Sequence, residues 1–473
     1  MNRLVQTEEL EVSHPLLFGD GPLYRRLAAG LQDAIESGQY QPGQRLPSAR
    51  WLRTRLGVSL NTVHQSLRLL EGDGWVEVRP QAGTFVLERR REVTASAQLP
   101  IPLHRSDLTM RLLEEMNQAD LARLGGSQPN QELLPTRQIR RLMGRLSRED
   151  FPNRYDLPAG CTELRRQIAR LAVAAGIRVE PEKVLLTSGC QEAVMACLQM
   201  LCREGDTVAV ESPTFYGYLE MLEVLRLKVL EIPSSPRNGL NLEALGQALE
   251  RHAVSCLLLT PNFSNPQGAL LPEPIKRKLA QLPIPIIEND IQGDLYYGEV
   301  RPLALRAFRP DVYYCSSFSK ILGPELRVGW VLPGDNAQAL ERSLTFRSFG
   351  SSALTRQALA EYLARGDYER VLRHARAHYG RQSRQTHLLL CQNLPPGSRV
   401  HRPEGGKMLW IQLPPNIDSL QLYQRCRARG ISLSPGHLYA SDDRYRNFLR
   451  LNCSYWSPEV KASLQELCRL AQA

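Results

Sequence analysis

Apolar residues recur at every fourth position near the start of the chain, at Leu23, Leu27, Leu31 and Ile35. This spacing places them on one face of a helix, which Gly38 and the turn sequence QPGQ are suited to end. The pattern predicts the first helix of a small domain.

Two further helices and a β-hairpin are predicted immediately after it. Ser48 can cap the helix ARWLRTRL, which Gly57 ends, and Ser59 can cap the helix LNTVHQSLRLLEGDG. The short runs WVEV and GTFVL then flank RPQAG, which is a hairpin signal. Three helices followed by a two-stranded wing predict a winged helix-turn-helix domain, mainly α with a β wing, over residues 15–88.

The third predicted helix buries Val63, Leu67 and Leu70 and so turns polar side chains outward near its start. Amide groups there can form bidentate hydrogen bonds with an adenine edge in the major groove, and the arginines and serines before them can hold phosphates. Residues 45–91 also contain nine arginines, four acidic residues and no lysine, a local charge of +5. We expect the domain to bind double-stranded DNA through Arg45, Ser48, Arg50, Ser59, Asn61, Thr62 and Gln65.

The segment 89–104, RRREVTASAQLPIPLH, is charged and then rich in Ser, Ala and Pro, and it has no apolar period. This composition predicts a linker. After it, residues 105–473 alternate β-rich runs such as KVLLTSG, TVAVESP, SCLLLTP and VYYCSSF with helical stretches. Strands that alternate with helices predict one large domain built on a doubly wound α/β sheet.

Several loops that follow these strands carry chemically useful groups. TSGCQEA places Gly189 and its neighbours at a helix N-terminus, where free N–H groups can bind a phosphate. TPNFSNPQG supplies the amide of Asn265, which could reach a phenolic oxygen, and IIEND supplies carboxylates able to pair with a pyridine nitrogen. SSFSK ends another strand with the amine of Lys320, and Arg327 adds a phosphate donor. Each signal alone is common, so their order along the chain carries the prediction.

The string LPSARWLRTRLGVSLNTVHQSLRLLEGDGWVEVRPQAGTFV closely resembles the DNA-binding domain of the GntR family of bacterial regulators. The resemblance covers about residues 20–87. The family usually has an arginine directly after the serine of GVS, where this chain has Leu60. We therefore expect one DNA contact of the family to be missing here.

The series LPAG, ELRRQIA, TSGCQ, ESPTF, NPQG, END, SFSK and RLN resembles the fold-type I aminotransferases along nearly all of residues 105–473. A GntR domain ahead of such a domain is the arrangement of the MocR subfamily, which the chain resembles from end to end. The resemblance implies a homodimer, a Schiff base between Lys320 and pyridoxal 5′-phosphate, and Arg450 as the bidentate partner of an effector carboxylate. It further implies cofactor contacts from Gly189, Cys190, Gln191, Phe215, Asn265, Ser317, Ser319, Arg327 and, from the neighbouring subunit, Tyr155.

One departure from these relatives concerns the cofactor ring. They typically have EDD followed within a few residues by a tyrosine, where this chain has END followed by Gln292. In the simplest register Asn289 occupies the position of the pyridine partner, and a neutral amide cannot hold the pyridinium charge. A shift of one residue would instead let Asp290 pair with the ring, and strand alternation argues against both side chains pointing into the site.

The leading hypothesis is a transcriptional regulator that uses pyridoxal phosphate to sense an amine, an amino acid or the cofactor itself. One alternative is a working aminotransferase with an attached DNA-binding domain. Another is a GntR repressor whose large domain has lost the cofactor and binds a different ligand. The END departure favours a regulator over an enzyme and leaves residual transaminase activity open.

Composition limits the remaining possibilities. The longest apolar runs are too short to span a bilayer, and the N-terminus lacks the apolar region of a secretory signal, so we expect a cytoplasmic protein with no membrane contact. Ten cysteines occur without a C-x-x-C pair or a Cys/His cluster of zinc spacing. We therefore expect free thiols and no metal site.

Overall fold

The computed structural model describes residues 22–36, 38–72, 75–79, 82–87, 105–118, 120–149, 155–236 and 239–472. The chain divides into two compact units, Met1–Ile101 and Pro102–Ala473. The expected linker at 89–104 and the expected domain start at 15–21 lie outside the described residues. Each unit has hydrophobic core clusters of its own.

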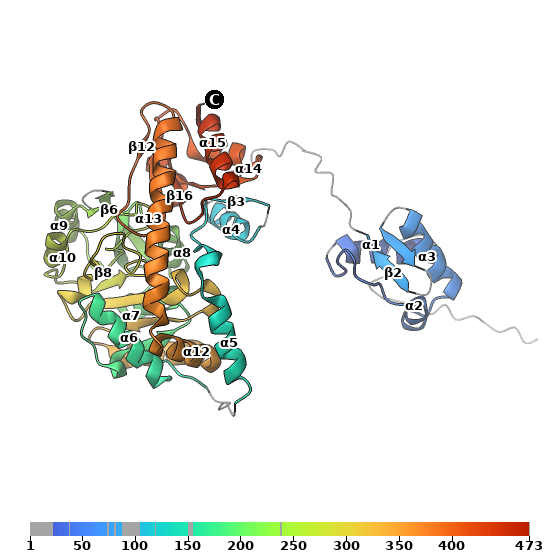
Figure 1. Ribbon diagram of the computed structural model, residues 1–473, viewed down its shortest axis with the longest axis horizontal. Coiled ribbons are helices and arrows are strands. Elements are labelled where there is room, and N and C mark those ends of the chain that lie inside the picture. Colours follow the sequence, from blue (N-terminus) through green and yellow to red (C-terminus); the bar gives the residue numbers. More distant parts are fainter. Residues whose placement is uncertain are drawn as a thin grey trace, which may run out of the picture. The chain divides into compact units, whose positions relative to one another are not determined.

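The small unit is a three-helix domain with a β-hairpin (Figure 1). Its helices are α1 (Leu23–Glu36), α2 (Ala49–Leu56) and α3 (Leu60–Gly72), and its antiparallel strands are β1 (Val76–Arg79) and β2 (Gly83–Val86). The apolar stripes of α1 and α3 meet in one core, which contains Leu27, Leu31, Leu52, Leu56, Val63, Leu67, Leu70, Val76 and Val86. The winged helix-turn-helix predicted from the sequence is confirmed.

An eight-stranded sheet forms the centre of the large unit, in the order β4-β11-β10-β9-β8-β5-β6-β7. The strands are β4 (Leu185–Thr187), β5 (Thr207–Ser212), β6 (Lys228–Ser235), β7 (Gly239–Leu240), β8 (Val254–Leu259), β9 (Ile286–Asn289), β10 (Tyr313–Ser317) and β11 (Gly329–Leu332). Strands β10, β9, β8, β5 and β6 run parallel, whereas β11 is antiparallel to β10 and β4, and β7 is antiparallel to β6. The carboxyl ends of the parallel strands therefore meet at one edge, where α/β proteins place their ligands.

Alternate residues of the sheet strands face two different helical layers. In β4, Leu185 packs in the cluster with the helices at residues 190–201 and 216–224, and Leu186 packs in the cluster with the helices at 136–146, 162–174 and 353–364. The helices are α5 (Thr136–Leu146), α6 (Thr162–Ala174), α7 (Cys190–Leu201), α8 (Tyr216–Val224), α9 (Leu242–Arg251), α10 (Glu273–Leu279), α11 (Ala337–Ser348), α12 (Ala353–Ala364) and α13 (Asp367–Asn393). Strands covered on both faces explain why the β-rich runs are almost continuously apolar.

A smaller antiparallel sheet follows, in the order β12-β13-β16-β15, reached by the long helix α13 (Figure 1). Its strands are β12 (Arg399–Val400), β13 (Met408–Gln412), β15 (Ser434–Pro435) and β16 (Phe448–Asn452). Helices α4 (Arg105–Glu115), α14 (Ser419–Arg427) and α15 (Pro458–Gln472) pack in one hydrophobic cluster with this sheet, as do the paired strands β3 (Ala122–Arg123) and β14 (Ile431–Ser432). Strand β16 carries Arg450 into this core.

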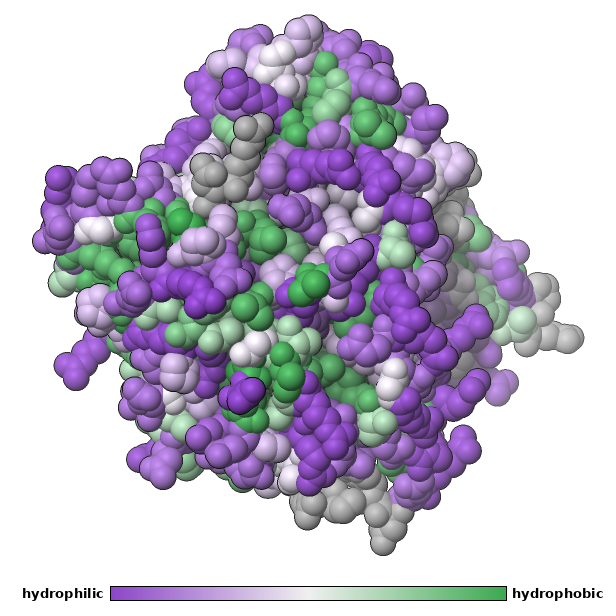
Figure 2. Space-filling model, turned by 60° about the vertical axis from the view of Figure 1, so that its left-hand side comes forward, coloured by the Kyte–Doolittle hydropathy of each residue, from purple (hydrophilic) through white to green (hydrophobic). Residues whose placement is uncertain are grey.

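The surface in Figure 2 is a mosaic in which hydrophilic side chains interrupt the hydrophobic areas. Among the described residues, no helix is long and apolar enough to cross a membrane. Nor do the described residues contain a group of three His, Cys, Asp or Glu side chains that could hold a metal ion.

Candidate cofactor and DNA-binding sites

Lys320 stands at the carboxyl edge of the central sheet, in the 3₁₀ turn Phe318–Lys320 that follows β10. Its amine donates hydrogen bonds to Ser127, to the carbonyl oxygen at 2.9 Å and to the hydroxyl at 3.2 Å. Burial lowers the pKa of Lys320 to about 8, and the positive charges of Arg450 and Arg327 act in the same direction. Because a neutral amine is a nucleophile, this lysine is suited to attack a carbonyl carbon.

A closely packed cradle surrounds the N-terminus of α7. Gly189 precedes the helix with a φ of 102°, and a Cβ there would lie 2.6 Å from Nη2 of Arg327. A Cβ on Gly329 would lie 2.6 Å from the carbonyl carbon of Gly189 and 2.8 Å from the amide nitrogen of Cys190. Arg327 itself donates to the carbonyl oxygen of Ser188 at 2.6 Å. A helix start with a guanidinium across it suits a phosphate group, and both glycines are needed for this close approach.

Three further residues that were predicted to bind the phosphate border this cradle. Ser317 pairs with Gly329 across β10 and β11, and its hydroxyl accepts from the N–H of Ser319 at 3.4 Å. Gln191 lies in the first turn of α7. The structure therefore brings the serines, the arginine and the helix start to one place beside Lys320.

Asn289 ends β9 and faces the start of α7. Its amide oxygen accepts a hydrogen bond from the Cys190 thiol at 3.3 Å and one from the N–H of Ile291 at 3.1 Å. Burial raises the pKa of Cys190 strongly, so this thiol is a neutral donor. The side chain of Asn289 is thus directed toward the predicted phosphate cradle.

Asp290 is directed to a different part of the core. Its buried carboxylate accepts from the Arg301 guanidinium at 2.6 Å, from the Tyr314 hydroxyl at 2.8 Å and from the Asn262 amide at 2.9 Å. Arg301 also holds Asp294 at 2.6 Å. The structure thus places the Asp290 carboxylate among these three donors, whereas the Asn289 amide lies beside the start of α7.

Arg450 is fully buried in β16 and has no carboxylate partner among the described residues. Its Nη1 donates to the amide oxygen of Asn265 at 3.0 Å, and its Nη2 donates to the carbonyl oxygen of Gly125. Its Nε has no hydrogen-bond partner in the described part of the chain. An unneutralised guanidinium with a free donor suits an incoming carboxylate.

Phe215 precedes α8, after the carboxyl end of β5. Its ring centroid lies 4.7 Å from that of Tyr216 and 5.5 Å from that of Tyr218. A Cβ on Gly217 would lie 2.4 Å from the Phe215 ring, so this glycine lets the ring fold back over its own helix. The ring is held at the sheet edge that carries Lys320, where stacking on a cofactor was expected.

The predicted DNA-binding residues lie on the exposed side of the small unit. Asn61 and Gln65 are exposed on α3, while Ser59 caps that helix by accepting from the N–H of Thr62 at 3.0 Å. The two hydroxyls of Ser59 and Thr62 also bond one another at 2.8 Å. Ser48 caps α2 by accepting from the N–H of Trp51 at 3.2 Å. Both caps fix the two helices of the helix-turn-helix relative to their connecting turns.

The two remaining arginines of this set are also exposed. Arg45 pairs with Phe85 in an isolated bridge, and its Nε would lie 2.4 Å from a Cβ on Gly83. Arg50 follows the cap of α2. The first arginine therefore lies against the wing and the second at a helix N-terminus, both positions from which phosphates can be reached.

Comparison with known proteins assigns each of the two units to a protein family. Residues 23–86 match the gntR family of bacterial regulatory proteins, and residues 119–467 match aminotransferase class I and II. Two Escherichia coli K12 proteins, the uncharacterized HTH-type transcriptional regulators YjiR and YdcR, are 34% and 32% identical to this chain. The alignments cover 91% and 95% of this chain and 94% and 99% of those proteins. The chain is a GntR-type regulator of the MocR-like architecture.

The large domain of this GntR-type regulator is similar to aminotransferases themselves. The 2-aminoadipate transaminase of Thermus thermophilus is 29% identical over 76% of this chain and 92% of its own. The crystal structure of the α-aminoadipate aminotransferase LysN from Thermus thermophilus, complexed with N-(5′-phosphopyridoxyl)-L-leucine, superposes with a TM-score of 0.70 at 26% identity and covers 78% of this chain and 98% of LysN. The expected fold-type I aminotransferase fold is confirmed.

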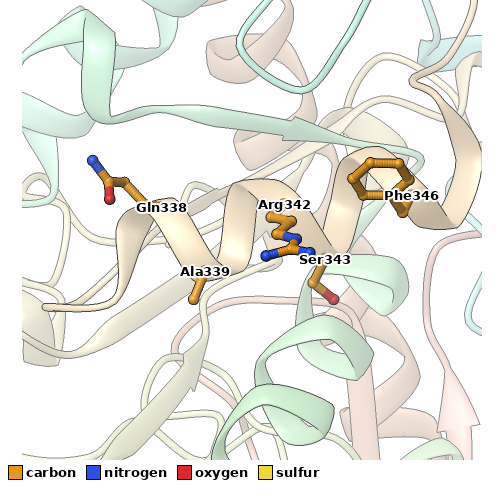
Figure 3. Close-up of a pocket in the computed structure, with 5 residues that line it drawn as sticks. All are labelled: Gln338, Ala339, Arg342, Ser343 and Phe346. Carbon is orange, nitrogen blue, oxygen red and sulfur yellow. The ribbon is translucent and has the colours of Figure 1, made fainter.

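Tyr155 of this GntR-type regulator lies on the surface, 80% exposed. Its ring centroid is 5.7 Å from that of Phe349, which is 5.9 Å from that of Phe346. Phe346 in turn borders a hollow along α11, whose other lining residues are Gln338, Ala339, Arg342 and Ser343 (Figure 3). Among the described residues, no contact joins Tyr155 to the residues of the phosphate cradle.

Sequence reasoning missed the lysine of the segment EGGKMLW. Lys407 is fully buried, and its amine has no hydrogen-bond partner in the described part of the chain. Burial lowers the pKa of Lys407 well below its ordinary value, and the charge on Lys320 lowers it further. The signal in the sequence for a buried amine was a lysine directly before the apolar, strand-like run MLW.

Proposed function

We propose that this GntR-type regulator holds pyridoxal 5′-phosphate on Lys320 and changes its affinity for an operator when an amine or amino acid enters the same site. The phosphate cradle is the observation that carries this proposal. Two glycines without room for a Cβ, a guanidinium and a helix N-terminus meet beside a lysine whose pKa is lowered to about 8.

The residues of the cradle have distinct parts in this proposal. The N–H groups of Cys190 and Gln191, the hydroxyls of Ser317 and Ser319, and Arg327 would bind the phosphate. Phe215 would stack on the ring, and Asn265 would bond the phenolic oxygen. When bound, pyridoxal phosphate supplies an electrophilic carbonyl carbon and an electron-accepting ring. Lys320 presents the amine that captures the cofactor and gives it up to a competing amine.

Asn289 supports sensing over catalysis. Its side chain faces the start of α7, whereas Asp290 is committed to Arg301. A neutral amide at the ring nitrogen cannot hold a positive charge there, so the ring would withdraw electrons weakly. Capture of an amine requires only Lys320 and the incoming amine, and it survives this change.

Arg450 supports an effector that carries a carboxylate. The guanidinium is fully buried, lacks a carboxylate partner among the described residues and has no hydrogen-bond partner there for its Nε. An amino acid would satisfy that donor through its α-carboxylate while its amine competes with Lys320. Such an effector shifts the equilibrium between two conformations only through differences in its contacts with each of them.

We further propose a cytoplasmic homodimer in which Tyr155 reaches the phosphate of the partner chain. Tyr155, Phe349 and Phe346 form a series of exposed aromatic rings. Exposed apolar rings of this kind support the proposal that a partner subunit covers this surface. Two small units per dimer would contact two half-sites of double-stranded DNA, with Asn61 and Gln65 on the base edges.

A spectral titration coupled to operator binding tests the proposal. Purified protein is titrated with pyridoxal phosphate and then with single amino acids, while the absorbance of the bound cofactor and the affinity for an operator fragment are recorded. We expect the cofactor band in the wild type, its loss in Lys320→Ala, and a change in operator affinity with one class of amine. Sustained keto-acid production at ordinary enzyme rates would instead support the alternative of an active aminotransferase. A cofactor band that never forms would support a large domain with a different ligand.

A further inference from the structure

Two cysteines outside the cofactor site lie in contact between α7 and the central sheet. Cys202 caps the C-terminus of α7, and Cys256 lies in β8 next to Val208 of β5. Their sulfur atoms are 3.7 Å apart. Cys256 is fully buried, whereas Cys202 is only partly buried. One cysteine of the pair is therefore partly exposed to solvent, and the other is fully buried in contact with it.

We propose that Cys202 and Cys256 are a peroxide-reactive dithiol that closes into a disulfide. The Cys202 thiolate attacks one oxygen of hydrogen peroxide, the O–O bond breaks, and a sulfenic acid and hydroxide form. The hydroxide becomes water by taking up the proton that Cys202 released to the solvent when it ionised. The thiol of Cys256 then attacks the sulfur of that sulfenic acid, a sulfur–sulfur bond forms, and the hydroxyl leaves as a second water with the Cys256 proton. Two thiols are oxidised and one peroxide is reduced to two waters.

The environment of the pair suits this order of events. The hydrogen bond from the Cys256 thiol lowers the pKa of Cys202, although burial and the charge of Asp206 oppose the effect. The pKa of Cys256 is raised strongly by the same contact and by burial. Cys202 is thus the thiolate that reacts first and Cys256 the thiol that resolves the product.

The other thiols of the chain lack this combination of access and partner. Cys197 and Cys315 are fully buried, so a solute does not reach them. Cys391 is exposed on α13, but its sulfur lies 3.7 Å from a ring nitrogen of His387 and the structure places no second thiol beside it among the described residues. Cys391 therefore serves as a matched control for simple surface oxidation.

The position of the pair links it to the cofactor cradle. Helix α7 begins at Cys190 in the cradle and ends at Leu201, directly before its C-cap Cys202, and β8 leads through Asn262 to Asn265. A disulfide requires the sulfurs to move from 3.7 Å to a bond length of about 2 Å. Because Gly189 and Gly329 leave no space at the other end of the helix, we expect the closure to weaken cofactor binding. This last consequence, unlike the disulfide itself, rests on the proposed function.

Peptide mass spectrometry of the full-length protein tests the disulfide. Reduced protein is freed of reductant, treated with increasing hydrogen peroxide, quenched, alkylated and digested with and without dithiothreitol. We expect a dithiothreitol-sensitive cross-link between the peptides of Cys202 and Cys256 and the loss of two of the ten thiols. The cross-link should persist in Cys391→Ser and disappear in both Cys202→Ser and Cys256→Ala.

Three results would overturn the proposal: sulfinic or sulfonic acid on Cys202 without the cross-link, oxidation confined to Cys391, or no reaction at Cys202. The wild-type digest decides among them even if a variant fails to fold. Cofactor affinity is then measured on reduced and oxidised wild type, and we expect it to fall about fivefold or more on oxidation. An intact cross-link in a protein that never binds pyridoxal phosphate would refute the proposed function and leave the disulfide standing.

Discussion

The Arg301 guanidinium holds the Asp290 carboxylate at 2.6 Å in the core of the large unit, and this pair leaves Asn289 as the END residue that faces the cradle. Both charged side chains are almost completely buried. Removing one partner of such a pair leaves an uncompensated charge in a region of low polarity. The pair is thus a structural element beside the site rather than a part of the site.

Arg301→Gln is therefore expected to lower the free energy of unfolding by about 3–5 kcal/mol, because Asp290 and Asp294 would lose their shared cation. Urea denaturation followed by tryptophan fluorescence measures the change. Arg277→Gln, which removes an exposed i,i+4 pair with Glu273 and the contact of the guanidinium with the Phe308 ring, is the control and should shift stability by about 1 kcal/mol or less. Equal losses in the two variants would contradict the structural role of Arg301.

Asn289→Asp is expected to increase aminotransferase activity. A carboxylate at the ring nitrogen keeps it protonated and strengthens the ring as an electron acceptor. We expect keto-acid formation from an added amino acid to rise about tenfold or more, which corresponds to about 1.4 kcal/mol in the barrier. Asn289→Ala removes the amide without adding charge and should give no rise, so a similar gain in both variants would count against this position.

The rate at which Lys320 captures pyridoxal phosphate should increase with pH up to about 8 and then level off. The pKa of Lys320 is lowered to about 8, so the nucleophilic neutral amine predominates only above that pH. Stopped-flow absorbance between pH 6.5 and 9.5 measures the rate, with Lys320→Ala as the control for capture by surface amines. A rate that keeps rising tenfold per pH unit to pH 9.5 would indicate an unperturbed lysine instead.

Lys407→Met is expected to stabilise the protein. The buried amine has no hydrogen-bond partner among the described residues, and replacing it with an apolar side chain of similar shape removes a penalty of about 1–3 kcal/mol. Because the pKa of Lys407 is lowered in the folded state, the unfolded chain binds the extra proton, and wild-type stability rises with pH toward 10.5. The advantage of the variant should therefore shrink as pH increases.

Urea denaturation at several pH values checks this prediction in protein without added cofactor. Lys183→Met is the control, because the Lys183 side chain is 63% exposed and pairs with Glu180 on the surface. A Lys407→Met protein that is less stable than the wild type would show that the amine has a partner in solution, such as bound water or an anion.

Asn61→Ala and Gln65→Ala are each expected to weaken operator binding by about 1–3 kcal/mol and to relax sequence preference at one base position. Both side chains are exposed on α3, on the side away from its buried stripe. Arg50→Ala should instead weaken binding to all DNA sequences alike. It should also reduce the slope of log affinity against log salt concentration by about one, because one counterion fewer is released. Affinity measured by fluorescence anisotropy at several salt concentrations separates the two outcomes, and an unchanged preference in both amide variants would count against base contacts by Asn61 and Gln65.

Local patterns were enough to predict the folds of both units. The four-residue spacing of α1, the Ser caps of α2 and α3, and the alternation of apolar strands with helices each reflect short-range geometry that any packed context preserves. The order of the loops after the strands was also informative, because parallel strands bring their carboxyl ends to one edge whatever the details of packing.

The sequence by itself determined which segments reach that edge: those that carry Lys320, Arg327, the residues END and the start of α7. Only the tertiary structure gave the neighbours Asn289 and Asp290 different surroundings, since Arg301, Tyr314 and Asn262 approach Asp290 from other segments. The contact of Cys202 with Cys256 and the isolation of Lys407 were likewise invisible along the chain. Periodicity fixes which side of an element a residue occupies, whereas partners across the core are fixed by packing between segments distant in sequence.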